Sequence, residues 1–235
     1  MSLKALFKGW FGEFKVKLAM ALFLDSKHYV RLHNVTLPTA DGTTQIDHIL
    51  VSRYGIFVLE TKSLKGLIIG DEKSPQWTQK LFTQQFNFQN PLRQNYRHVC
   101  ALADLLGITH DRFISIVIFN GDCQLQKSHL PNVISGDYIR YIKRHRKVMF
   151  TQEQVQQVVS AIKAGRLANT WQVRRQHIAS LQKRLAKPPL CPQCGSKLVL
   201  RMAKTGKKAG TSFYGCSSYP QCRHISPIPK GQGKA

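Results

Sequence analysis

The stretch Gln45-Ile-Asp-His-Ile-Leu-Val-Ser-Arg-Tyr-Gly-Ile-Phe-Val-Leu-Glu-Thr-Lys62 decides the fold of the first part of the chain. Residues 45–52 have the composition of a strand, Arg53-Tyr-Gly55 is typical of a turn, and Ile56-Phe-Val-Leu59 is an uninterrupted apolar run. Such a run is typical of a central strand that is buried on both faces. The sequence therefore predicts two neighbouring strands, joined by a short turn, in a sheet that helices cover.

Charged residues end this apolar run abruptly. Glu60 and Lys62 are two positions apart, so their side chains leave the strand on the same face, and Asp47 on the preceding strand can lie opposite Glu60. Charges at the end of a buried strand need partners. Carboxylates that hold Mg²⁺, with an ammonium group nearby, are the groups that metal-dependent phosphodiester cleavage requires. As a bare pattern, however, an Asp followed by Glu-x-Lys also occurs by chance in many proteins.

Further elements extend the predicted core on both sides. Strands are predicted at 29–35 and 113–119, and helices at the N-terminus, at 136–147, at 151–162 and at 169–185. The helix at 136–147 carries a run of basic residues: Arg140, Lys143, Arg144, Arg146 and Lys147. Thr151 and Gln154 form a capping-box pattern at the start of the next helix. The expected fold class is α/β, with a mixed sheet flanked by helices.

The domain boundaries follow from composition. Ala186-Lys-Pro-Pro-Leu190 breaks the preceding helix. We predict a first domain at 1–165, a basic helical connector at 166–188, a small cysteine-containing module at 189–227 and a disordered tail at 228–235. Glu13 interrupts the signal-like N-terminus, and no stretch approaches the roughly 20 apolar residues that span a bilayer. The sequence therefore predicts a cytoplasmic protein without a membrane partner.

Two pairs of cysteines near the C-terminus have the spacing of metal ligands. They are Cys191-Pro-Gln-Cys194 and Cys216-Ser-Ser-Tyr-Pro-Gln-Cys222. Four thiolates in two close pairs can surround one zinc ion, and a module this small has too little apolar mass to fold without a metal or a cross-link. A disulfide pairing is the alternative, but no other feature of the chain indicates an oxidising compartment. The pattern predicts a four-cysteine zinc ribbon.

The charge distribution indicates a polyanionic partner. The chain has a formal net charge of +23, and the part that follows Glu153 contains fifteen lysines or arginines and no carboxylate. Such a one-signed field attracts nucleic acid and releases its counterions on binding. An anionic membrane surface could use the same field, and a basic tail can also serve solubility alone. Nucleic acid is the expected partner.

The cysteine module resembles the C-terminal zinc modules of bacterial type I topoisomerases, because it has a Cys-Pro-x-Cys-Gly opening and a Tyr-Pro-x-Cys end. The resemblance implies binding of single-stranded DNA. The implied contacts are stacking on Phe213, Tyr214 and Tyr219 and phosphate binding by Lys204, Lys207, Lys208 and Arg223. The aromatic residues could instead only cover the zinc core, and related modules bind RNA or protein.

The first domain resembles the NERD (nuclease-related) domain over roughly residues 9–125. The matching residues are Gly12-Glu13, Gln45–Val51, Gly55–Lys62, Lys65-Gly66, Trp77 and Asn90–Gln94 with His98. The family belongs to the PD-(D/E)xK nuclease superfamily. The resemblance implies an acidic site of Glu13, Asp47 and Glu60, with Lys62 as the catalytic lysine and Gln94 as an auxiliary polar residue. It also implies a Mg²⁺ or Mn²⁺ site of Asp47, Glu60 and the Thr61 carbonyl.

Some of these positions have other interpretations. Gln45 stands where the family often has Glu, which removes one possible negative charge and predicts weaker metal affinity. Glu13 could be an exposed helix residue, and His98 is expected to pack or cap rather than to take part in chemistry.

The sequence leaves two function classes open. The first is a Mg²⁺-dependent nuclease that acts on single-stranded or branched DNA in repair or recombination, near the nucleoid. The second is a non-catalytic DNA-binding protein that retains a nuclease fold. A topoisomerase activity is excluded because the chain is far too short for a strand-passage enzyme. The sequence predicts no particular protein partner.

Overall fold

The computed structural model describes residues 3–126, 130–168, 170–185, 191, 193–194, 196–203 and 210–227, with side chains from Gly12 to Gln182 and from Cys191 to Ser226 within these ranges. The chain divides into two compact units, residues 1–177 and 178–235. Each unit is described by itself. The predicted tail at 228–235 and the predicted helix break at 186–190 lie outside the described residues, so the predicted domain boundaries stay predictions.

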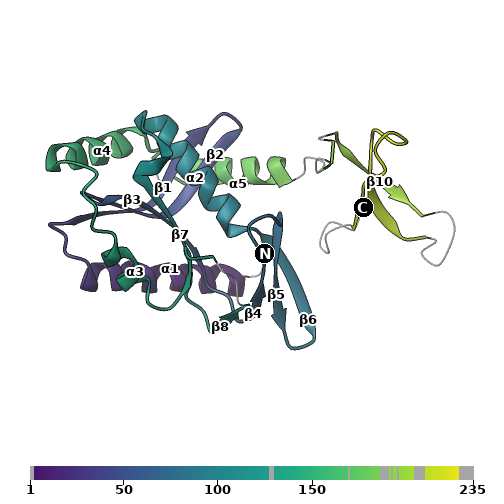
Figure 1. Cartoon of the computed structure of the whole chain (residues 1–235), viewed down its shortest axis with the longest axis horizontal. Coiled ribbons are helices and arrows are strands. Elements are labelled where there is room, and N and C mark those ends of the chain that lie inside the picture. Colours follow the sequence, from purple (N-terminus) through teal and green to yellow (C-terminus); the bar gives the residue numbers. More distant parts are fainter. Residues whose placement is uncertain are drawn as a thin grey trace. The chain divides into compact units, whose positions relative to one another are not determined.

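A five-stranded mixed sheet forms the centre of the first unit (Figure 1). Its strands are β1 (Tyr29–Thr39), β2 (Gly42–Ser52), β3 (Gly55–Lys62), β7 (Phe113–Phe119) and β9 (Val133–Ser135), in the order β1-β2-β3-β7-β9. β1, β2 and β3 pair antiparallel, whereas β3, β7 and β9 pair parallel. The parallel pairing of β3 with β7 requires a crossover connection, and the helix at Pro91–Leu106 provides it.

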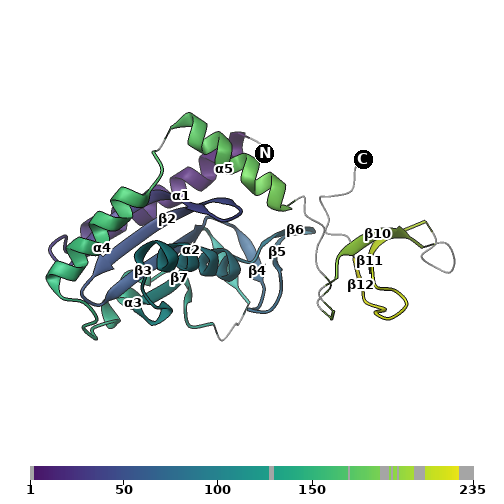
Figure 2. The same ribbon diagram turned by 90° about the horizontal axis from the view of Figure 1, so that it is seen from above.

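Helices cover both faces of this sheet, as Figures 1 and 2 show. One face packs against α1 (Leu3–Phe23) and α3 (Tyr138–Arg144). The other face packs against α2 (Pro91–Leu106) and α4 (Gln152–Gly165). This arrangement confirms the predicted fold class, a mixed sheet flanked by helices.

The two helical layers explain the apolar run of β3. Ile56 and Val58 belong to the core under α2 and α4, while Phe57 and Leu59 belong to the core over α1 and α3. All four side chains are fully buried. Each contributes roughly 1.5–3 kcal/mol of hydrophobic stabilisation, which fixes β3 in the centre of the sheet.

A second sheet combines three strands from the segment between β3 and α2 with one strand that follows β7, and it was not predicted from the sequence. It has the order β6-β5-β4-β8, with β4 (Gly66–Ile69), β5 (Gln76–Leu81), β6 (Gln84–Gln89) and β8 (Cys123–Leu125). Trp77 of β5 is buried and stacks on Phe119 of β7, with 6.0 Å between the ring centroids and 1° between the ring planes. This stacking joins the two sheets into one unit.

The helices after β9 partly correct the sequence prediction. α3 is shorter than the predicted helix at 136–147, because it ends at Arg144 and the following segment is not helical. That segment is tied elsewhere: the backbone N–H groups of Met149 and Phe150 both donate to the carbonyl oxygen of Arg53. α4 begins with the predicted capping box of Thr151 and Gln154.

The remaining elements are short or lie towards the C-terminus. They are the 3-10 helix η1 (His110–Arg112), α5 (Trp171–Leu185) and the strands β10 (Leu198–Met202), β11 (Ser212–Cys216) and β12 (Ile225–Pro227). β10, β11 and β12 form one antiparallel sheet, drawn in yellow-green in Figure 2. In the described part of the chain, no helix combines the length and the apolar character that crossing a membrane requires.

Candidate acidic site and zinc ribbon

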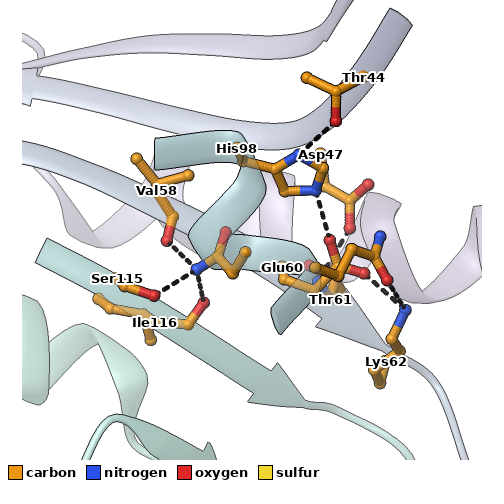
Figure 3. A network of polar contacts seen from close by, with 11 residues as sticks. Thr44, Asp47, Val58, Glu60, Thr61, Lys62, His98, Ser115 and Ile116 are labelled. Carbon is orange, nitrogen blue, oxygen red and sulfur yellow. Dashed lines mark hydrogen bonds and ion pairs between the residues drawn. The ribbon is translucent and has the colours of Figure 1, made fainter. Parts of the chain in front are cut away.

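Asp47 and Glu60 lie side by side at the carboxyl end of β3 (Figure 3). The β2–β3 register pairs His48 with Leu59, so the next residues outward are Asp47 and Glu60. The backbone N–H of Thr61 donates to Oδ2 of Asp47 at 2.8 Å. The strand turn thus brings together two carboxyl groups that are thirteen positions apart in the sequence.

Lys62 holds one oxygen of the Glu60 carboxylate. Its Nζ donates to Oε1 of Glu60 at 2.6 Å and to Oε1 of Gln94 at 3.0 Å. Glu60 is buried and Lys62 is 22% exposed, so this ion pair is shielded from most of the solvent. The predicted site residues Glu60, Lys62 and Gln94 therefore meet in the structure.

His98 holds the other oxygen of Glu60, a contact that the sequence interpretation missed. Its Nε2 lies 3.1 Å from Oε2 of Glu60, and its Nδ1 lies 2.8 Å from Oγ1 of Thr44. The imidazole is buried and bridges α2 to β2 and β3 (Figure 3). A signal was present: Gln94 and His98 are four residues apart on one helix and share a face.

Asn95 fixes α2 against the sheet next to this network. Its side-chain amide donates to the carbonyl oxygens of Val58 and Ile116, at 2.8 and 3.2 Å, and to Oγ of Ser115 at 2.8 Å. Asn95 is fully buried. Because these bonds tie α2 to both β3 and β7, they fix the position along β3 at which Gln94 and His98 reach the site.

Glu13 approaches the same end of β3 from α1. A Cβ atom at Gly12 would lie 2.6 Å from Cβ of Ser63, so only glycine allows α1 to come this close. The carbonyl of Gly12 also accepts a 2.6 Å hydrogen bond from the Asn120 side chain. Glu13 lies near enough for its charge to act on Glu60 and Lys62. The predicted acidic residue of the first helix thus joins the site.

The four cysteines of the second unit come together as predicted. Their sulfur atoms all lie within 4.8 Å of one another, with 3.6 Å between Cys191 and Cys222 and 3.4 Å between Cys194 and Cys216. Four thiolates at a Zn–S distance of about 2.3 Å are spaced by about 3.8 Å around a tetrahedral ion. The donor set and its spacing therefore fit structural zinc.

The ribbon sheet sorts the candidate DNA-binding residues by face. Phe213 is paired with Arg201 across β10 and β11, so both side chains leave the same face. The Arg201 guanidinium lies 5.5 Å from the ring centroid of Tyr219, which is 58% exposed. Tyr214 points to the opposite face and packs against the cysteine cluster.

The basic residues of the ribbon fall into two groups. Arg223 is exposed. Lys204, Lys207 and Lys208 lie outside the described residues. The sequence interpretation missed Arg201. Its position beside Phe213 follows from the pairing of β10 with β11, which the structure shows.

Family models match both units. Residues 8–120 match the nuclease-related domain, and residues 189–231 match the topoisomerase DNA-binding C4 zinc finger. An uncharacterized protein of Bacillus anthracis is 35% identical over 186 residues, which cover 77% of this chain and 86% of that protein. The chain belongs to the nuclease-related domain (NERD) family. It carries in addition a topoisomerase-type zinc ribbon.

Two further relatives match this NERD protein over 41 and 38 residues, lengths close to that of the ribbon match at residues 189–231. DNA topoisomerase 1 of Methanocaldococcus jannaschii is 46% identical over 41 residues, which are 17% of this chain and 5% of the topoisomerase. The uncharacterized protein YrdD of Escherichia coli is 45% identical over 38 residues, which are 16% of this chain and 18% of YrdD. No solved structure matches the chain.

Burial and mutual repulsion shape the electrostatics of the NERD site. Burial raises the pKa of Asp47 well above its usual value, and the charges of Glu60 and Glu13 raise it further. Burial also raises the pKa of Glu13, with Glu60 as the next cause. Burial alone would raise the pKa of Glu60, but the Lys62 ammonium and His98 outweigh it, so this pKa is lowered. Burial opposes the charge of Lys62, yet Glu60 raises its pKa.

These shifts bear on whether the site fits a divalent cation. Three carboxyl groups approach one end of β3, and burial together with the charge of Glu60 raises the pKa values of the other two, Asp47 and Glu13. Oxygen-rich, negatively charged clusters of this kind are the sites that Mg²⁺ or Mn²⁺ occupies through carboxylates and carbonyl groups. A bound cation would relieve the repulsion that a single ammonium group does not fully offset. The chemical type of these groups suits such an ion, but among the described residues only the four cysteines bring three or more ligand atoms close enough together to hold a metal as they stand. A divalent cation at this end of β3 is therefore a proposal.

Proposed function

We propose that this protein is a divalent-metal-dependent nuclease that acts on DNA and uses its zinc ribbon to hold the substrate. A NERD domain joined to a topoisomerase-type ribbon supports a protein that processes DNA. The observation that carries the catalytic part of the proposal is the convergence of Asp47, Glu60 and Lys62 at the carboxyl end of β3. We further propose that the reaction belongs to DNA repair or recombination.

Asp47, Glu60 and the Thr61 carbonyl would hold the cation. When bound, the ion supplies Lewis-acid polarisation of a phosphate oxygen and lowers the pKa of a coordinated water. Lys62 remains beside Glu60, where its ammonium group can orient the attacking water or offset negative charge that develops on the phosphate. Gln94 and His98 position Lys62 and Glu60 through the 3.0 and 3.1 Å contacts described above.

The ribbon face around Phe213 suits single-stranded or branched DNA. The exposed ring of Tyr219, the guanidinium of Arg201 and the half-buried ring of Phe213 offer flat surfaces and positive charge together. Base stacking on such rings contributes on the order of 1–3 kcal/mol per base and tolerates any sequence. Unpaired bases are available in single strands and at branch points, which supports this substrate class.

Two features favour a second candidate, a DNA-binding protein without catalysis. Each oxygen of Glu60 already has a partner, Lys62 on Oε1 and His98 on Oε2. Gln45 also stands at the position where the family often has another carboxylate. Both features weaken the pull of the site on a cation, and a protein with this site could bind DNA while cutting slowly or not at all.

A cleavage assay separates the two candidates. Labelled single-stranded, duplex, flapped and branched DNAs are incubated with the purified chain in Mg²⁺, Mn²⁺ or EDTA. We expect cleavage with either ion, none in EDTA and none with Glu60→Gln, while Glu72→Gln, an exposed residue outside the site, cleaves normally. Cleavage that persists in Glu60→Gln would indicate a contaminant or another site and would contradict the assignment of Glu60 to catalysis. Binding without cleavage under all conditions would establish the second candidate.

A further inference from the structure

Six basic residues gather at the amino end of β3, far from the acidic site. We call them the basic end: Arg53, Arg140, Lys143, Arg144, Arg146 and Lys147. Arg53 lies in the β2–β3 turn, and the others lie on α3 and the segment that follows it. The backbone hydrogen bonds from Met149 and Phe150 to the Arg53 carbonyl, at 2.7 and 3.1 Å, fasten that segment to the turn.

All six side chains of the basic end are exposed, and within the described residues none of them forms an ion pair. Two of them have other contacts: Nε of Arg146 donates to the Lys143 carbonyl at 3.4 Å, and the Arg144 guanidinium packs on the Tyr141 ring.

The nearby carboxylates offset the charge of the basic end only in part. Asp111 pairs with Arg112 at 3.6 Å, and its charge also acts on Lys147. Asp137 caps the first turn of α3, and Glu153 acts on Arg53. Like charges held this close repel one another and destabilise the folded state. A polyanion would remove that repulsion.

The composition of the basic end favours phosphate groups over lipid. Four of the six residues are arginines, whose planar guanidinium groups bind phosphate through two parallel hydrogen bonds. A membrane-binding surface would also present several large apolar side chains, whereas Val148 is the exposed apolar residue of the segment from Arg140 to Phe150. We propose that the basic end holds the phosphate backbone of DNA that flanks the segment at the acidic site.

The length of β3 sets the scale of this contact. β3 has eight residues, from Gly55 to Lys62. At about 3.3 Å per residue its two ends are roughly 26 Å apart. B-DNA rises by 3.4 Å per base pair along one strand, so duplex DNA that reaches both ends must extend at least about eight base pairs. The inference rests on the proposed function for the identity of the polyanion as DNA and for the position of that DNA at the acidic site.

The test compares two variants of the full chain that have the same net charge. The first is Arg140→Gln, Lys143→Gln, Arg146→Gln and Lys147→Gln; Arg144 is kept because its guanidinium packs on the Tyr141 ring at 4.9 Å. The control is Lys27→Gln, Lys73→Gln, Lys80→Gln and Lys163→Gln, four exposed lysines elsewhere in the first unit. Fluorescence anisotropy with a labelled duplex of about 30 base pairs, long enough to reach both ends, is recorded across a salt series without added Mg²⁺ or Mn²⁺ and without a chelator that would remove the ribbon zinc.

We expect the first variant to lower the slope of log affinity against log salt by about 3.6, because four phosphate contacts are lost and each removes about 0.9. The control should change the slope by less than one. Equal changes of slope in the first variant and the control would overturn the proposal. It would also be overturned if the first variant bound DNA normally but lost binding to phosphatidylserine vesicles, because that result would identify a lipid-binding surface. If the first variant unfolds, Lys143→Gln with Lys147→Gln is compared with Lys27→Gln with Lys73→Gln, and a slope change of about two is expected. Because no Mg²⁺ or Mn²⁺ is added, metal-dependent cleavage does not occur during the measurement, and failure of the proposed nuclease activity leaves it unaffected.

Discussion

The ribbon and the acidic site both gather several ligand groups, but they differ in what holds those groups in place. The four thiols come from two short segments and have little buried apolar structure around them, mainly Leu198 and the half-buried Tyr214. The carboxyl groups come from α1, β2 and β3 and lie between two large cores. The fold of the ribbon therefore depends on its metal, whereas the acidic site is built whether or not an ion binds. Removing a ligand should unfold the ribbon but only silence the acidic site.

The largest effect expected from this difference is the loss of the ribbon in Cys216→Ser. Zinc binding to such a site supplies roughly 10–16 kcal/mol, which is also the folding energy of the module. We expect about one zinc per chain in the wild type, measured by elemental analysis, and loss of both zinc and ribbon structure in the variant, followed by proton NMR. Cys123→Ser, in β8 of the first unit, serves as the control. A ribbon that keeps its structure without zinc would contradict the statement that its fold depends on the metal.

The acidic site should lose activity without losing its fold. We expect Asp47→Asn and Lys62→Gln each to reduce cleavage by a factor on the order of 10³, and the double variant to lose little more, because residues that act as one unit are not additive. Gel-based cleavage rates give the effect, and circular dichroism shows whether the first unit remains folded. Affinity for DNA without added Mg²⁺ or Mn²⁺ should change less than twofold. If the factor by which the double variant loses cleavage rate equals the product of the two single-variant factors, the residues act independently.

Stacking on the ribbon is the next largest expected effect. Replacing Phe213 and Tyr219 by Ala should weaken binding to single-stranded DNA by on the order of 1–3 kcal/mol for each lost base contact. The salt slope should hardly move, because stacking releases few counterions. Leu200→Ala is the matched control, because Leu200 pairs with Tyr214, so its exposed side chain leaves the opposite face from Phe213. Anisotropy titrations with a single-stranded probe measure both quantities, and a large change in slope would assign these rings to another role.

The smallest effect concerns the contact between α1 and β3. Gly12→Ala places a Cβ atom 2.6 Å from Cβ of Ser63, and overpacking of this kind costs roughly 1–3 kcal/mol, partly offset by about 1 kcal/mol of better helix propensity. We expect a lower thermal midpoint and slower cleavage, because Glu13 moves with the helix. Ser63→Gly removes the clashing atoms and should restore both in the double variant. Full activity of Gly12→Ala alone would show that the position of Glu13 is not critical.

How far the sequence predicted the molecule follows from the range of the interactions involved. β3, its buried apolar run and the meeting of Asp47 with Glu60 were predicted because one strand turn creates them, and the thiol cluster because two short loops do. The hairpin of β5 and β6 was missed, since Gln, Asn and Thr dominate its strands and its fold depends on Trp77 packing on Phe119.

The polar contacts of α2 show the same limit. His98 was expected to pack or cap, and its bonds to Glu60 and Thr44 depend on where Asn95 fixes the helix against the sheet. That position is set by the tertiary structure. The local sequence indicated only that Gln94 and His98 share one side of the helix. The assignment of the site residues to catalysis stays a prediction, which the cleavage experiments test.

The bridge between Thr44, His98 and Glu60 has a spectroscopic consequence. An ionised carboxylate only accepts hydrogen bonds, so the Nε2 atom of His98 must carry a proton in either charge state of the ring. This proton is buried, and its exchange with water should be slow enough for a separate resonance in the imidazole region of the proton NMR spectrum. Titration with Mg²⁺ or with the paramagnetic Mn²⁺ should shift or broaden that resonance before any DNA is added. The imidazole is thus a built-in reporter of cation occupancy at Glu60.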